Sequence, residues 1–172
     1  DAIHPDRSAN DIDVVIGVRG PIAPPEMCNG LMVPLVAFDQ IYSFDCDALV
    51  KAIPRPEAAL AERFEPAARE LFHRIMQLTD NAGASDEHRA LNYLAMRYPA
   101  IYWKAAEQFG RDFSLTRVEV RPSALSGTRR IVDAIFSYTN RNTDFTEKFS
   151  VRVDIGEEFP FLVTKLSPCF DF

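Results

Sequence analysis

Histidine and cysteine side chains are candidates for chemistry, because they bind metal ions and act as bases or nucleophiles. The chain has 172 residues, with three histidines and three cysteines. A zinc site needs such residues in clusters, and Cys28, Cys46 and Cys169 lie far apart in the sequence. His73 and His88 flank one predicted turn between helices, although such histidines more often lie on the surface or cap a helix. We therefore expect no metal site, with His73 and His88 as weak candidates.

No nucleophile in the sequence has the neighbours that covalent catalysis needs. The thiolate of Cys46 is disfavoured by the negative charges of Asp45 and Asp47, which makes this cysteine a poor nucleophile. The chain has no Gly-x-Ser-x-Gly elbow, and the Ser-Gly-Thr run at residues 126–128 is typical of a plain turn. We therefore expect no catalytic residue and no enzymatic activity.

Glycines and paired carboxylates also favour structural roles. Gly17 and Gly20 do not form a phosphate-binding loop, because no helix is predicted to follow them. The adjacent Glu157 and Glu158 are typical of a turn in contact with water. We expect no bound cofactor.

The overall composition narrows the class of protein. A hydrophobic content of 47% and a charged content of 26% are ordinary for a globular protein. The net charge of −6 provides no basic field for nucleic acid or an anionic membrane, and no apolar run approaches the ~18 residues of a membrane span. We therefore expect neither nucleic acid nor a membrane as a partner. Three scattered cysteines favour reduced thiols in the cytoplasm over a disulfide framework.

The clearest structural pattern lies at residues 130–155. Residues 131–139 are rich in β-branched and aromatic side chains, and the Asn- and Asp-rich link at 140–144 is typical of a turn. Beyond the link, apolar and polar residues alternate, the period of a strand with one face in contact with water. The pattern predicts a long β-hairpin. The residues predicted to face its core side are Phe145, Phe149, Val151, Val153 and Ile155.

Two amphipathic helices are predicted before this hairpin. Apolar residues recur at helical spacing over residues 57–78, and Pro66 inside the pattern kinks the helix or starts a new one. Ser85 is a good N-cap for the second helix, which should kink near Pro99 and stop at Gly110. A short loop between the two helices predicts an antiparallel pair.

Shorter elements complete the predicted fold. Pro34 places its strand at an edge or a bulge, and Arg19 to Glu26 should break regular structure because of three prolines. The strands are predicted at residues 12–18, 31–38, 115–120 and 161–166, and a short helix at 45–53. This order predicts an α+β fold: an antiparallel sheet with a long C-terminal hairpin, covered on one face by an antiparallel helix pair.

The domain organisation is predicted to be simple. Residues 1–11 are polar and contain proline, so we expect a flexible N-terminal arm. Residues 12–172 should form a single α+β domain, because a chain of this length can bury a sizeable core. The chain begins at Asp1 with neither an initiator Met nor a signal peptide, so we expect it to be a fragment of a longer protein.

Three stretches resemble the C-terminal domain of PatG-type cyanobactin maturation proteases, a domain of unknown function. They are residues 12–31 (IDVVIGVRGPIAPPEMCNGL), 80–93 (DNAGASDEHRALNY) and 136–144 (FSYTNRNTD), and the likeness extends over about residues 12–168. In that family the domain follows a subtilisin-like protease domain that cuts and macrocyclises a ribosomally made precursor peptide. The family assigns no catalytic residue to this region. The resemblance implies cytoplasmic peptide natural-product (RiPP) maturation, with a subtilisin-like protease domain as partner in the same polypeptide or pathway.

Two functions of different classes remain. We expect a non-catalytic accessory domain that binds peptide or protein or mediates oligomerisation, with the precursor peptide and a second copy (a homodimer) as further candidate partners. The alternative is a cryptic enzyme acting on the precursor peptide. An exposed apolar edge or patch would favour binding, whereas a convergent polar pocket with perturbed titratable groups would favour catalysis. The acidic balance favours a neutral or basic peptide, added to a strand edge or lying across an apolar groove.

Overall fold

The computed structural model describes residues 11–55, 61–77, 81, 83 and 85–170. The chain divides into two compact units, Asp1–Leu49 and Val50–Phe172, and each is described by itself. The predicted arm at residues 1–11 falls outside the described residues, apart from Asp11, which begins the first strand. A single domain over residues 12–172 stays a prediction. None of the described helices is long and apolar enough to cross a membrane.

The first unit is a β-hairpin. Strand β1 (Asp11–Ile22) pairs antiparallel with strand β2 (Pro34–Asp45) in a sheet of two strands. The pairing is regular at its start, where Ile12 lies opposite Phe44, and shifts register after Ile16 and again after Arg19. These shifts are bulges, in which one strand carries extra residues that its partner does not match.

Both strands of this hairpin are longer than predicted. The predicted break over Arg19 to Glu26 begins only at Ala23, because β1 continues to Ile22 and accommodates Gly20 and Pro21 at its second register shift. Strand β2 begins at Pro34 and not at residue 31, since a proline without an N–H is tolerated at the first position of a strand.

The second unit contains most of the helical residues. Helix α1 (Cys46–Ala52) spans the division between the units, and Asp45 Oδ1 caps it by accepting a hydrogen bond from Asp47 N at 2.7 Å. Helix α2 (Ala61–Gln77) continues through Pro66. Helix α3 (Asp86–Arg97) begins at the predicted N-cap, where Ser85 Oγ accepts a hydrogen bond from His88 N at 3.2 Å. Helix α4 (Ala100–Gly110) stops at the predicted residue.

The second predicted helix is divided in two, which corrects the expected kink. The chain leaves the helical conformation at Tyr98, with φ −125° and ψ 82°, and Pro99 then begins α4. A residue before proline is sterically disfavoured from helical geometry, and proline has no N–H to continue the hydrogen-bond ladder.

A second antiparallel sheet has five strands. The predicted hairpin is confirmed as β4 (Ile131–Asn140) and β5 (Thr146–Asp154), with β3 (Phe113–Pro122) on the other side of β4. The predicted strand at residues 161–166 is replaced by two short strands that both pair with β5, β6 (Phe161–Leu162) and β7 (Ser167–Pro168).

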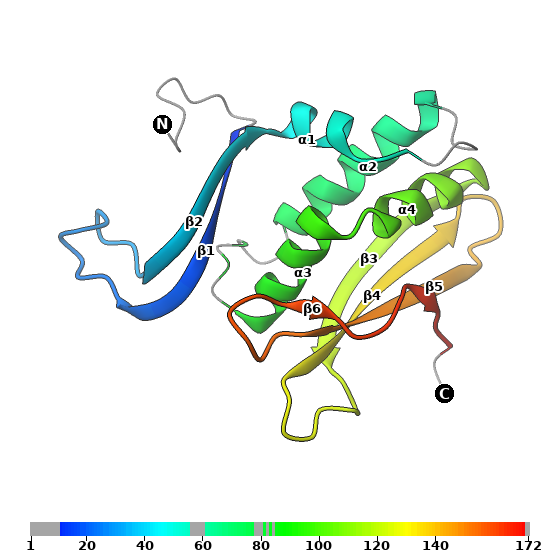
Figure 1. The fold of residues 1–172 in the computed structure, drawn as a ribbon. Coiled ribbons are helices and arrows are strands. Elements are labelled where there is room, and N and C mark those ends of the chain that lie inside the picture. Colours follow the sequence, from blue (N-terminus) through cyan, green and yellow to red (C-terminus); the bar gives the residue numbers. More distant parts are fainter. Residues whose placement is uncertain (1–10, 56–60, 78–80, 82, 84, 171–172) are drawn as a thin grey trace. The chain divides into compact units, whose positions relative to one another are not determined.

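Helices α2, α3 and α4 cover one face of this sheet, which makes the fold α+β (Figure 1). Phe149, Val151 and Val153 are 6%, 0% and 0% exposed, so the predicted core side of β5 is confirmed for these residues. Lys104 of α4 lies over the Phe149 ring, with its Nζ 4.7 Å from the ring centroid. Phe145 is an exception at 61% exposed, because it lies in the turn before β5, where its carbonyl accepts a hydrogen bond from Asn140 N.

Two side chains tie the helices to neighbouring segments. Arg89 of α3 donates from Nη1 to the Ile155 carbonyl oxygen at 2.8 Å, just beyond the end of β5. Trp103 of α4 donates from Nε1 to the Pro54 carbonyl oxygen at 2.6 Å. Hydrogen bonds of this kind satisfy carbonyl groups outside the regular ladders and fix the helices in place.

Candidate functional site

The β1–β2 hairpin exposes large apolar side chains along both strands. In β1, Val15, Val18 and Ile22 are 48%, 60% and 45% exposed. In β2, Phe38 and Tyr42 are 60% and 50% exposed. The register puts Val15 and Phe38 on one face of the hairpin and Val18 and Tyr42 on the other. Single exposed apolar residues are ordinary, but several on both faces of one hairpin indicate an interaction surface. The hairpin is therefore the candidate binding site of the chain.

The edges of the two sheets differ. In the five-stranded sheet, β3 has a register shift after Leu115 and ends in Pro122, two features that hinder the addition of another strand. On its other side β5 is partly covered by β6 and β7. In the two-stranded sheet, each strand has one side that pairs with no strand among the described residues, and the pairing from Asp11 to Ile16 is regular. This hairpin offers the longer free edge.

Backbone hydrogen bonds hold the loop between β1 and β2. Ala23 N donates to the Val33 carbonyl oxygen at 2.8 Å and closes the base of the loop. Further along, Gly30 N donates to the Pro25 carbonyl oxygen at 2.8 Å. Gly30 has a φ of 85°, a conformation that glycine adopts without steric cost. The loop thus has a defined backbone conformation.

Three large apolar side chains project from this loop. Met27, Leu31 and Met32 are 65%, 64% and 81% exposed, and we refer to them as the tip cluster. They are at least as exposed as any of the large apolar side chains on the two strands. Cys28, for which no catalytic role is predicted, lies in the same loop as a free, half-buried thiol.

Acidic side chains dominate the described part of the first unit. Over residues 11–49, Arg19 is the one basic residue, against six acidic residues, which gives a net charge of −5. The acidic residues are Asp11, Asp13, Glu26, Asp39, Asp45 and Asp47. An apolar surface in such surroundings attracts basic partners, accepts neutral ones and repels acidic ones.

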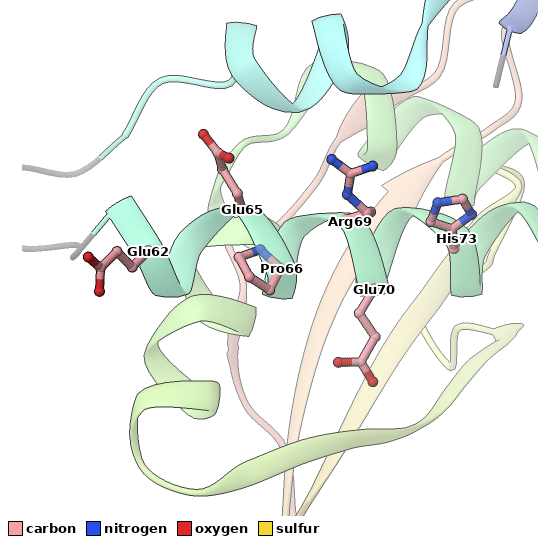
Figure 2. A pocket seen from close by; sticks show the side chains of 6 residues that line it. All are labelled: Glu62, Glu65, Pro66, Arg69, Glu70 and His73. Atoms are coloured by element: carbon pink, nitrogen blue, oxygen red, sulfur yellow. The ribbon is translucent and has the colours of Figure 1, made fainter.

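A shallow depression of about 490 Å³ lies along α2 in the second unit. Its lining residues are Glu62, Glu65, Pro66, Arg69, Glu70 and His73. Figure 2 shows that Glu65 and Arg69 point to one side of the helix and Glu70 to the other, so the charged groups do not converge. Glu65 also accepts a hydrogen bond from Arg55 Nη2 at 2.6 Å. Catalysis needs groups that meet at one reacting atom, and this arrangement does not supply them.

The two histidines named from the sequence lie in different environments. His73 is exposed and lines the α2 depression, whereas His88 is buried in α3 at 8% exposed. Among the described residues, no group of three or more His, Cys, Asp or Glu side chains is arranged to hold a metal ion. The weak metal candidacy of His73 and His88 therefore gains no support from geometry, and the expected absence of a site stays a prediction.

A polar network joins the end of α4 to β5. Arg111 Nη1 and Nη2 donate to the two carboxylate oxygens of Glu147 at 2.9 and 2.7 Å, and Gln108 Nε2 donates to Oε2 at 2.9 Å. The hydrogen bonds from Arg111, with a smaller effect from Gln108, lower the pKa of Glu147, although burial opposes this shift. A carboxylate bound from three directions is not free to act on a substrate, so the network is structural.

The serine and the other cysteines also have structural surroundings. Ser126 Oγ lies 2.6 Å from the Ile131 carbonyl oxygen, to which it donates, and it accepts a hydrogen bond from Ile131 N at 3.1 Å. The loop is therefore the plain turn that the sequence predicts. Cys46 is buried at 2% exposed and Cys169 is half-buried, and neither forms a disulfide.

Comparison with known proteins now identifies the family. The model of the PatG C-terminal family matches residues 58–168, which is more than half of the chain. The chain belongs to the PatG C-terminal family. Of the three stretches that suggested this, residues 80–93 and 136–144 lie inside the match and residues 12–31 lie outside it.

A solved structure supports the same assignment at the level of the fold. It is described as a PatG domain of unknown function, and it superposes with a TM-score of 0.61 at 18% sequence identity. The superposition covers 82% of this chain and 56% of the other, so this chain spans little more than half the length of that protein. A search of curated proteins found no match.

Proposed function

We propose that this PatG C-terminal domain is a non-catalytic accessory module that binds a peptide or a protein through its β1–β2 hairpin. The observation that carries the proposal is the run of exposed apolar side chains along β1 and β2, from Val15 to Tyr42. A two-stranded sheet is marginally stable alone, and a third strand makes it more stable. A bound extended chain supplies that third strand.

The binding mode is strand addition supported by apolar contact. An extended segment pairs with backbone N–H and C=O groups on the side of β1 that no described strand occupies, along its regular stretch from Val14 to Ile16, whatever the side chains of the segment. Burial of Val15, Val18 and Phe38 against the segment supplies the favourable free energy, at about 25 cal/mol per Å² of apolar surface removed from water. Such contacts tolerate variation in the bound sequence, as a system that processes variable precursor peptides requires.

The proposed setting is cytoplasmic maturation of a cyanobactin-like peptide. The candidate partners are a subtilisin-like protease domain in the same polypeptide or pathway and the precursor peptide itself. Family membership supports this setting. A homodimer formed by two hairpins is the competing arrangement, and the same experiment distinguishes it.

The test is a binding titration on the 172-residue chain. Fluorescein-labelled precursor peptide and the purified protease domain are titrated separately, and light scattering gives the mass of the free chain. We expect binding to at least one of the two, weakened at least about tenfold by the double variant Val18→Ser/Phe38→Ser. Leu125→Ser and Phe145→Ser are matched controls, since these second-unit side chains are 59% and 61% exposed. A monomer that binds neither probe at millimolar concentration would overturn the proposal.

A further inference from the structure

We infer that the tip cluster (Met27, Leu31 and Met32) is the anchor of this surface, and that it inserts into an apolar pocket of a protein partner whose rim carries Lys or Arg side chains. The inference rests on the proposed function. It specifies which part of the hairpin supplies the affinity and what chemistry the partner presents to it.

The first argument is exposure on a preorganised loop. The three side chains are 65%, 64% and 81% exposed, yet the loop beneath them is closed by the hydrogen bond from Ala23 N to the Val33 carbonyl oxygen. An ordered loop loses little conformational freedom when it binds, so more of the contact free energy appears as affinity. Methionine side chains also adjust to irregular pockets, which suits an anchor.

The second argument is charge. Glu26 precedes the first residue of the tip cluster, and the described part of the first unit carries −5 overall. A pocket rimmed by basic side chains complements that field. An anionic bilayer would be repelled by it, since membrane attachment through surface charge requires basic residues. A second copy of the hairpin would bring −5 against −5, which disfavours self-association at this surface.

The principal experiment measures the affinity of the whole chain for the purified subtilisin-like protease domain. We expect the triple variant Met27→Ser/Leu31→Ser/Met32→Ser to bind at least about 30-fold more weakly, because each lost burial is worth about a factor of three or more in the binding constant. Leu125→Ser and Phe145→Ser should stay within about twofold of the wild type. Wild-type binding should also weaken as ionic strength rises from about 0.1 M to about 0.5 M, because salt screens the acidic unit from the basic rim.

A second variant separates the side chains from their presentation. Gly30→Val keeps the whole tip cluster but places a β-branched residue at a φ of 85°, which L side chains rarely adopt. We expect a loss of affinity of at least about tenfold with the second unit still folded by circular dichroism. Retained affinity in Gly30→Val would show that the loop conformation is not what positions the anchor, and would overturn the argument from preorganisation.

The outcomes separate the inference from the proposed function. If the wild type binds and the triple variant binds equally well, the tip cluster is not the anchor while the binding function stands. If the triple variant loses only self-association by light scattering, the occupant is a second copy and the inference is wrong. Binding to phosphatidylcholine–phosphatidylglycerol vesicles that depends on the tip cluster would identify a bilayer as the occupant and would also overturn the inference. If the wild type binds neither the protease domain nor the precursor peptide, the proposed function itself fails.

Discussion

Glu147 shows how one side chain connects a helix to the sheet in this fold. Arg111, just past the last turn of α4, and Gln108 in that turn hold both of its carboxylate oxygens. Because these hydrogen bonds lower the pKa of Glu147, the ionised form is favoured in the folded state more than in the unfolded state. The resulting stabilisation is present above the ordinary pKa of 4.5 and is lost as pH falls through the lowered value.

The first prediction concerns the pH dependence of stability. Glu147→Gln should lower the melting temperature clearly at about pH 7 and by less at about pH 3, because the stabilisation from the ionised wild-type carboxylate declines as the pH falls below 4.5 toward its lowered pKa. Thermal melts by circular dichroism at both pH values measure this. Glu157→Gln is the control, because the side chain of Glu157 is exposed and should matter little at either pH. An equal deficit for Glu147→Gln at both pH values would contradict the prediction.

Strand β5 has one apolar and one polar face, and the second prediction tests which is which. Val151 is fully buried, so Val151→Asp places an unpaired charge in the interior and should cost on the order of 3–5 kcal/mol. That is a large part of the total stability of an ordinary domain. Lys148 pairs with Ser137 on the opposite face, so Lys148→Asp should cost less than about 1 kcal/mol. Chemical denaturation measures both, and equal midpoints for the two variants would mean that the faces are reversed.

The third prediction concerns the close approach of β1 and β2 at the first register shift. A Cβ atom on Gly17 would lie 2.2 Å from the Ala37 carbonyl oxygen and 2.6 Å from Phe38 Cα, so Gly17→Ala must push the strands apart. We expect faster hydrogen exchange at the amides of β1 and β2, with the amides of β4 and β5 unchanged. Gly127→Ala is the control, because no atom lies within 4 Å of a Cβ at that position. Unchanged exchange in β1 and β2 would show that this contact does not limit the pairing.

Local patterns predicted the elements that depend on local physics. The alternation over residues 146–155 and the cap at Ser85 both appear in the structure. Both features are set by residues that lie within a few positions of one another in the sequence, so a local pattern is enough to predict them. Phe145 fits the alternation but lies in the turn, since Asn140 sets the turn with its own side chain, accepting from Asn142 N at 2.9 Å. Turn geometry there overrides the apolar pattern.

At the scale of the whole molecule, the candidate site was the part least accessible from sequence. The apolar residues of β1 and β2 are typical of core strands, and nothing local distinguishes a strand inside a large sheet from one in a separate two-stranded sheet. The distinction depends on which segments pack together, and the structure gives these strands a sheet of their own. The sequence offered only His73 and His88 as weak candidates for a metal site, and in the structure His73 is exposed and His88 is buried.

The fourth prediction concerns the whole chain. Incubated with precursor peptide, the pure protein should leave the mass of the peptide unchanged, because the described residues offer no nucleophile with a base positioned to activate it. Mass spectrometry after extended incubation decides this, with the subtilisin-like protease domain as the positive control. A cleaved or cyclised product formed by the pure chain would favour the alternative of a cryptic enzyme.

Trp103 has a practical consequence for studies of this protein. It is the one tryptophan of the chain, and its indole N–H donates a hydrogen bond to the Pro54 carbonyl oxygen. Both residues belong to the second unit. Its fluorescence emission therefore reports on the contact between α4 and the segment after α1, and a shift of the emission to longer wavelength marks the loss of that contact. The β1–β2 hairpin contains no such chromophore, so a dye attached to Cys28 would give it an optical signal of its own.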